Sequence, residues 1–168
     1  FLNKEVTYEK ELSNLSKIIT TKIYGKSISP NLTYYYLKSI KLPEQIFPGD
    51  NNMHFDRFLP NLKIIYFPYE TDENTAPFRY ALGSHTIDTN YLDFFSNNEK
   101  KVFDDRNEMI KKLGNMPELK INLKKNSLIV ALTNGLHGRC PFKKISERYS
   151  LFLTYPKFNL LSLIPFKN

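Results

Sequence analysis

The chain has 168 residues, of which 41% are hydrophobic, so it is long enough for one domain with a substantial core. Its 24 Lys and Arg against 17 Asp and Glu give a net charge of +7, but the lysines are scattered in short pairs, which predicts a solvated surface and no nucleic-acid partner. A single cysteine excludes an internal disulfide, and no apolar run approaches the roughly 20 residues of a membrane helix, so we expect a cytoplasmic protein without a membrane partner.

The first predicted element is a helix over about residues 5–24. One stripe at helical spacing carries its apolar side chains, which are Tyr8, Leu12, Leu15, Ile19 and Ile23. Gly25 and Pro30 follow the last of them and predict its end. The chain starts at Phe1 rather than at methionine, so we expect that residues upstream have been removed or belong to a longer protein.

Short runs of aromatic and β-branched residues, separated by Pro, Gly, Asn and Asp, then predict strands. They cover 31–38, 52–58, 62–69, 77–82, 118–123, 127–132 and 147–155. A charged segment within about 86–116 interrupts them and predicts a lid-like insertion. We therefore expect residues 1–168 to form a single domain, mainly β with flanking helices, whose β core spans about 30–156 as a sandwich or jelly roll.

His54 and Asp56 are separated by one residue in a predicted strand. Side chains at i and i+2 of a strand project from the same face, so the imidazole and the carboxylate lie side by side. Such a pair is either a hydrogen-bonded couple or two ligands of one metal ion. A lone histidine in a strand is more often structural than ligating, and the tripeptide alone does not decide between these interpretations.

His137 lies between Gly135 and Gly138, just beyond the strand 127–132, where the backbone can turn sharply. Two histidines and one carboxylate form the facial triad of non-haem Fe(II) oxygenases, in which coordination positions stay open for other ligands. Arg148 and Ser150 share one face of the last strand, and an inward-facing arginine is costly without an anionic partner. A dicarboxylate provides one, although an ordinary Arg–Glu pair at a strand edge is the alternative.

Four motifs occur in a recognisable order: His54-x-Asp56, "APFRYALGSH" at 76–85, "GLHG" at 135–138, and Arg148. Over about residues 30–156 this order resembles the phytanoyl-CoA dioxygenase family of Fe(II)- and 2-oxoglutarate-dependent oxygenases. The chain departs from the family at turns. Leu82 replaces a proline, Ala76 replaces the usual glycine, and Lys125-Asn126 replaces a Gly-Asp turn.

The resemblance implies a double-stranded β-helix of the jelly-roll, cupin-like type. It implies that His54, Asp56 and His137 bind the iron, and that Arg148 with Ser150 binds the distal carboxylate of 2-oxoglutarate. Tyr36 is expected to be a further cosubstrate contact. His85 corresponds to a structural family position, and Arg139 stands where the family often has a small polar residue.

The activity implied by the resemblance is oxidation of a small organic substrate by O₂, with release of succinate and CO₂. Relatives that halogenate have a small residue in place of the carboxylate, so Asp56 favours hydroxylation. A non-catalytic β-barrel module that engages an anionic partner is the alternative, supported by the altered turns, the short chain and the basic charge. The identity of the substrate and the oligomeric state are left open at this point.

Overall fold

The computed structural model describes residues 2–42, 53–56, 60–86 and 116–155. This part of the chain contains one helix and seven strands: α1 (Leu2–Tyr24), β1 (Asn31–Lys38), β2 (Leu62–Phe67), β3 (Phe78–Ala81), β4 (Glu118–Ile121), β5 (Ser127–Leu132), β6 (His137–Arg139) and β7 (Glu147–Thr154). Most of the predicted insertion lies outside the described residues. The strand predicted over 52–58 is described only at 53–56, where His54 makes an isolated bridge to His137.

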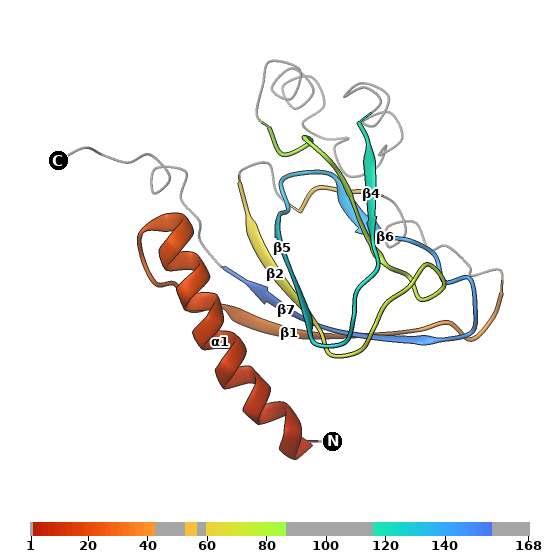
Figure 1. Ribbon diagram of the computed structural model, residues 1–168, viewed down its shortest axis with the longest axis horizontal. Coiled ribbons are helices and arrows are strands. Elements are labelled where there is room, and N and C mark those ends of the chain that lie inside the picture. Colours follow the sequence, from red (N-terminus) through yellow and green to blue (C-terminus); the bar gives the residue numbers. More distant parts are fainter. Residues whose placement is uncertain (1, 43–52, 57–59, 87–115, 156–168) are drawn as a thin grey trace.

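The strands form two antiparallel sheets, ordered β1-β7-β2-β5 and β4-β3-β6. The bridge at His54 adds that residue beside β6, at the open end of the second sheet. From β4 to β7, successive strands alternate between the two sheets, as in a jelly roll. The mainly β fold predicted from the sequence is confirmed, with one flanking helix in the described part (Figure 1).

The four-stranded sheet has two faces of different chemistry. In the register of β2 with β7, Lys63 lies opposite Thr154 and Ile65 opposite Phe152, so these side chains share the face turned toward the second sheet. The alternate residues form an apolar cluster on the outer face, where α1 covers the sheet (Figure 1); its buried members are Leu12, Leu62, Ile64, Tyr66, Leu151, Leu153 and Tyr155. The predicted alternation of β7 is confirmed.

The buried stripe of α1 differs from the predicted one. Leu12 is buried, but Leu15 and Ile23 are 39% and 49% exposed, because Ser16 and Thr20 occupy the face turned toward the sheet. The Ser16 hydroxyl forms a hydrogen bond with the hydroxyl of Tyr155, and this bond explains why a small polar residue lies there. No helix among the described residues is long and apolar enough to cross a membrane.

The end of α1 is where the sequence predicts it. Gly25 has a φ of 70°, a left-handed conformation that glycine adopts without steric cost, and its N–H donates a hydrogen bond of 2.9 Å to the carbonyl of Thr21. The chain then turns back, and β1 enters the sheet at its edge beside β7. Because of this turn, α1 packs on the outer face of the sheet and does not cover the inner face.

A second apolar cluster joins the two sheets from inside. Ile65 and Phe67 of β2 and Ile129 of β5 contact Phe78 of β3, and Phe152 of β7 packs against them. The core between the sheets is therefore apolar at its centre. Charged side chains of β2 and β7 lie on the same face as this cluster, and they belong to the site.

Candidate metal centre

The backbone brings two of the predicted ligands face to face. The N–H of His54 donates to the carbonyl of His137 at 2.8 Å, and the N–H of His137 donates to the carbonyl of His54 at 3.0 Å. Residues paired in this way in antiparallel chains project their side chains to the same side. Asp56 follows His54 by two residues and is held by a bond of 2.9 Å from its N–H to the carbonyl of Thr133.

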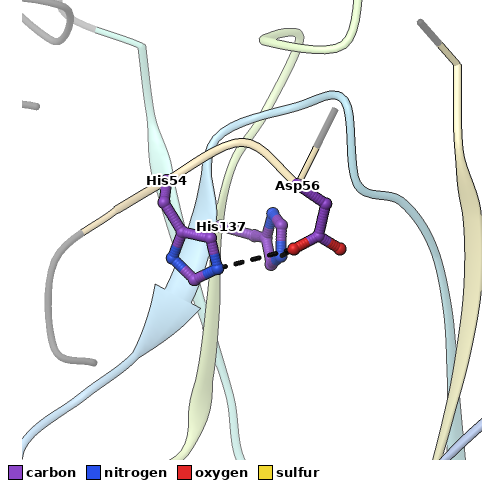
Figure 2. A group of neighbouring side chains, drawn as sticks. All are labelled: His54, Asp56 and His137. Carbon is purple, nitrogen blue, oxygen red and sulfur yellow. Dashed lines mark ion pairs between the residues drawn. The ribbon is translucent and has the colours of Figure 1, made fainter. Parts of the chain in front are cut away.

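His54, Asp56 and His137 converge from segments far apart in the sequence (Figure 2). Each offers one ligand atom, and these atoms all lie within 4.8 Å of one another. Oδ1 of Asp56 is 3.6 Å from Nε2 of His54 and 3.6 Å from Nε2 of His137. Adjacent ligands of an ion that binds them at about 2.1 Å lie about 3 Å apart, so small side-chain movements suffice for one ion to contact all three.

His137 is fixed in the tautomer that a metal ligand needs. Its Nδ1 is 2.9 Å from the carbonyl oxygen of Gly135, which can only accept, so Nδ1 carries the proton and Nε2 has a free lone pair. Burial, and then the nearby imidazole of His54, lower the pKa of His137 against the opposing effect of Asp56. The neutral ring is therefore favoured at neutral pH.

The turn before His137 leaves no room for a side chain at Gly135. A Cβ on Gly135 would lie 2.0 Å from the hydroxyl oxygen of Tyr80 and 2.9 Å from Oγ of Ser84. Both hydroxyls are committed: Tyr80 donates to the carbonyl of Leu132 at 2.7 Å, and Ser84 donates to Ala81 at 2.6 Å while accepting from the N–H of Leu136 at 2.8 Å. The Gly-Ser-His motif thus supports the turn that carries His137.

Asp56 is also paired with a lysine that the sequence analysis did not single out. Lys63 of β2 forms an ion pair with Oδ2, the oxygen on the far side from the two imidazoles. Burial raises the pKa of the Asp56 carboxyl, but the interactions with His137 and His54 and the charge of Lys63 outweigh it and hold the pKa well below its usual range. Asp56 is therefore an ionised carboxylate at neutral pH.

Arg148 lies in β7 on the inner face and is 5% exposed. Its guanidinium stacks over the ring of Phe67 at 5.0 Å, and Nη1 donates to the carbonyl of Ala76 at 2.6 Å. Its Nε has no hydrogen-bond partner among the described residues. Burial, followed by the charge of Arg139, lowers the pKa of Arg148 to about 10, so a buried positive charge remains at neutral pH. An incompletely bonded buried guanidinium fits an anionic ligand.

The contacts of the inner cluster connect Arg148 to the three ligands. The ring of Phe78 stacks on the imidazole of His137 at 5.9 Å, and Phe78 belongs to the same cluster as Phe67, on which Arg148 stacks. Ser150, two residues beyond Arg148 on the same face, is 4% exposed. Arg148 and Ser150 therefore lie in the interior between the sheets that also contains His137.

The structure does not bring Tyr36 to this interior, so the expectation for this residue is corrected. Tyr36 lies opposite Tyr149, stacks with its ring at 4.7 Å and is 50% exposed. In β1 it is Tyr35 that lies opposite Ser150 and packs against Phe152 at 4.2 Å. An error of one residue in a strand places a side chain on the opposite face.

His85 and Arg139 are the other two residues that the sequence analysis discussed near the site. His85 is exposed and is not a member of the metal-ligand group; its carbonyl accepts a bond of 2.9 Å from the side chain of Asn134. Arg139 follows His137 by two residues in β6, with its guanidinium 5.5 Å from the ring of Phe142 and Nη1 3.3 Å from the carbonyl of Cys140. The three-residue strand β6 was not predicted, because Gly135 and Gly138, on either side of His137, indicated a turn.

Two of the three departures from the family pattern include a residue with a left-handed backbone conformation. Ala76 and Asn126 have φ values of 55° and 60°, and they are the non-glycine residues with positive φ in the described chain. Asn tolerates this conformation well, and its Oδ1 accepts a bond of 2.8 Å from the hydroxyl of Tyr66. Ala76 bears a steric cost instead, in the segment whose carbonyl binds Arg148.

Comparison with known proteins extends this picture. No family model matches the chain, and no curated protein does. Solved structures do match: HygX from Streptomyces hygroscopicus with nickel and 2-oxoglutarate bound (TM-score 0.53, 13% identity), the non-haem α-ketoglutarate-dependent epimerase SnoN from nogalamycin biosynthesis (0.57, 15%), and EctD from S. alaskensis (0.58, 13%).

These likenesses decide the architecture. The fold is a double-stranded β-helix. The matches cover 92%, 83% and 83% of this chain and 66%, 53% and 48% of HygX, SnoN and EctD. The chain thus spans about half to two thirds of the length of these proteins.

Proposed function

We propose that the chain is a non-haem Fe(II)- and 2-oxoglutarate-dependent dioxygenase, related to the phytanoyl-CoA dioxygenase family, that hydroxylates a small organic substrate. The observation that carries the proposal is the convergence of His54, Asp56 and His137 within 4.8 Å. The residues fit the ion, because two imidazoles and an ionised carboxylate are the donor set of the facial triad. The solved structures with iron, or with nickel and 2-oxoglutarate, in the same fold support it.

The residues also fit the cosubstrate. In the proposal, the guanidinium of Arg148 binds the distal carboxylate of 2-oxoglutarate, with Nε among its donors, and the hydroxyl of Ser150 adds a further bond. Phe67 and Phe78 supply apolar walls that exclude water from this interior. The protein contributes position and electrostatics, which is its usual share in cofactor-dependent oxidation.

When bound, the iron would supply the oxidative chemistry, in which O₂ and 2-oxoglutarate give succinate and CO₂ while one oxygen atom is inserted into a substrate C–H bond. His137 would be a ligand through Nε2, because its Nδ1 proton is bonded to the carbonyl of Gly135. Asp56 supplies the negative ligand. In the family that the chain resembles, that carboxylate favours hydroxylation over halogenation.

The substrate would approach along apolar surface. A groove of about 260 Å³ is lined mostly by apolar side chains of β3, β4 and β5, among them Phe78 and Tyr80. Phe78, which lines the groove, also stacks on the imidazole of His137 at 5.9 Å. A small organic molecule with an apolar part fits this lining.

Anaerobic titration with Fe(II) and 2-oxoglutarate tests the proposal. We expect the melting temperature to rise, because ligands that bind only the folded state stabilise it, and we expect succinate release in the presence of O₂. His54→Ala should abolish both responses, and Arg148→Ala should abolish succinate release and the part of the rise that depends on 2-oxoglutarate. His85→Ala is the matched control for the rise in melting temperature, which it should leave unchanged, since this exposed histidine lies outside the ligand group.

Two results would contradict the proposal. If the His54→Ala and Arg148→Ala variants keep full iron-dependent succinate release, the assignment of the site is wrong. If the parent protein binds neither Fe(II) nor 2-oxoglutarate, the chain is not this enzyme, and a non-catalytic binding module becomes the better interpretation.

A further inference from the structure

Lys63 is a buried lysine in the middle of an apolar strand. It is 8% exposed, and every other residue of β2 is buried as well. A lysine ammonium is almost never buried to this degree unless it is paired. The outer face of β2 packs beneath α1, so Lys63 projects from the opposite face, into the interior between the sheets.

The ammonium of Lys63 has two neighbours there. It forms the ion pair with Oδ2 of Asp56, and it lies 5.1 Å from the ring centre of Phe152. Phe152 precedes Thr154, the residue opposite Lys63, by two positions in β7. These two contacts fix the position of Nζ. Lys63 therefore contacts the carboxylate on its far oxygen while Oδ1 remains toward the two imidazoles.

We propose that Lys63 is a positioning residue for the metal centre: by binding Oδ2, it fixes the Asp56 carboxylate so that Oδ1 alone is presented to the ion. The inference rests on the proposed metal centre. Rotation about the last torsion of an aspartate side chain is only loosely restricted, so a carboxylate without a fixed partner can turn either oxygen, or both, toward the ion. The ion pair removes this freedom.

Two effects of Lys63 on metal affinity oppose each other. Its positive charge repels a divalent cation and weakens Asp56 as a ligand, whereas its fixed contact keeps the ligand in place. If the charge dominated, removing it would tighten metal binding. If positioning dominates, as we propose, removing it weakens binding by about 10- to 100-fold, the usual loss when a partner of a metal ligand is removed.

Co(II) titration of the metal-free protein separates these roles, because the visible absorption of bound Co(II) changes with the number and symmetry of its ligands. We expect Lys63→Met, which keeps an unbranched side chain one atom shorter and removes the charge, to weaken Co(II) binding about 10- to 100-fold and to alter the spectrum. Lys63→Arg keeps the cation and should restore the spectrum of the parent and most of its affinity.

Ile65→Val is the matched packing control, since Ile65 lies two residues along the same face of β2 and belongs to the apolar cluster. It should leave both the Co(II) affinity and the spectrum unchanged. Melting temperatures of all four proteins show whether any loss of binding comes from unfolding. A structural role alone would lower the melting temperature of Lys63→Met without changing the spectrum of the ion that it binds.

Equal or tighter Co(II) binding by Lys63→Met, or a spectrum identical to that of the parent, would overturn the positioning role while leaving the metal centre intact. Failure of Lys63→Arg to recover more affinity than Lys63→Met would also overturn it. If the parent itself does not bind Co(II), both this inference and the proposed function are wrong.

Discussion

The two faces of the sheet β1-β7-β2-β5 are made by alternate residues of the same strands, yet they differ in how their buried polar groups are bonded. On the outer face, the polar groups among the apolar side chains have partners within the chain. The hydroxyl of Tyr155 bonds to Ser16, and that of Tyr66 bonds to Asn126. This face is an ordinary core, in which burial of apolar surface stabilises the fold.

The inner face carries buried charge beside its apolar cluster. Lys63 is paired with Asp56, but Arg148 is bonded only in part by the carbonyl of Ala76. An incompletely bonded buried charge lowers the free energy of unfolding unless a ligand completes its hydrogen bonds. The comparison teaches that stability and binding are carried by opposite faces, so substitutions on one face should affect one property and leave the other.

The largest expected effect is on the outer face. Leu153 is fully buried beneath α1, and Leu153→Ala removes its contacts and leaves a cavity, which should lower the free energy of unfolding by about 3 kcal/mol. Chemical denaturation measures this loss. The folded fraction should still bind Fe(II) with the affinity of the parent. Ile40→Ala, at a residue that is 77% exposed, is the neutral control.

The inner face should behave in the opposite way. Arg148→Met should weaken 2-oxoglutarate binding by about 100-fold, which corresponds to about 2.7 kcal/mol, because the carboxylate loses its buried partner. The free energy of unfolding should stay equal or rise, since an incompletely bonded buried charge is replaced by an apolar side chain. Calorimetry and denaturation measure the two quantities.

Arg79→Met is the control for this variant. Arg79 lies on the face of β3 opposite to that of Phe78 and pairs with Glu118 at 3.6 Å. Its loss should therefore leave 2-oxoglutarate binding unchanged. A large loss of stability in Arg148→Met with unchanged cosubstrate binding would reverse the assignment of the two faces.

A smaller effect is expected from one hydroxyl of the outer face. Tyr155→Phe leaves the buried Ser16 without its partner and should cost about 1 kcal/mol in the free energy of unfolding, with no change in metal or cosubstrate affinity. Tyr69→Phe, at a ring that is 52% exposed, should change neither property. Equal losses for the two variants would show that the buried bond is not what matters.

The smallest effect concerns Ala76, next to the inner face. In Ala76→Gly, relief of the left-handed backbone should raise the free energy of unfolding by about 1 to 2 kcal/mol. Loss of the buried methyl group and of chain stiffness should lower it by about 1 kcal/mol. We therefore expect a net stabilisation of less than about 1 kcal/mol by chemical denaturation. A clear destabilisation would mean that the methyl group, rather than the backbone, governs this turn.

Alternation along strands made most of the site predictable. The spacing of His54 and Asp56, and of Arg148 and Ser150, placed each pair on one face, and the order of the motifs along the chain indicated the fold. Tyr36 was misplaced because the residue of β1 that lies opposite Ser150 is its neighbour Tyr35. In α1, Leu15 and Ile23 were expected to be buried because apolar periodicity does not reveal that Tyr155 requires the hydroxyl of Ser16.

Lys63 could have been found from the sequence. In the run "LKIIYF" both alternating faces are otherwise apolar, which is typical of a strand buried on both sides. A lysine there is buried whichever way it points, and it then needs a carboxylate. What the sequence could not reveal is which carboxylate, because the pairing of β2 with Asp56 depends on how the two sheets face each other.

The central claim is that His54, Asp56 and His137 bind one metal ion. The most direct test is anomalous X-ray diffraction, at the iron absorption edge, from crystals grown anaerobically with Fe(II). The account predicts one peak at about 2.1 Å from Nε2 of His54, Oδ1 of Asp56 and Nε2 of His137, with Lys63 still on Oδ2. A peak elsewhere, or none at this site with iron present in the crystal, would contradict it.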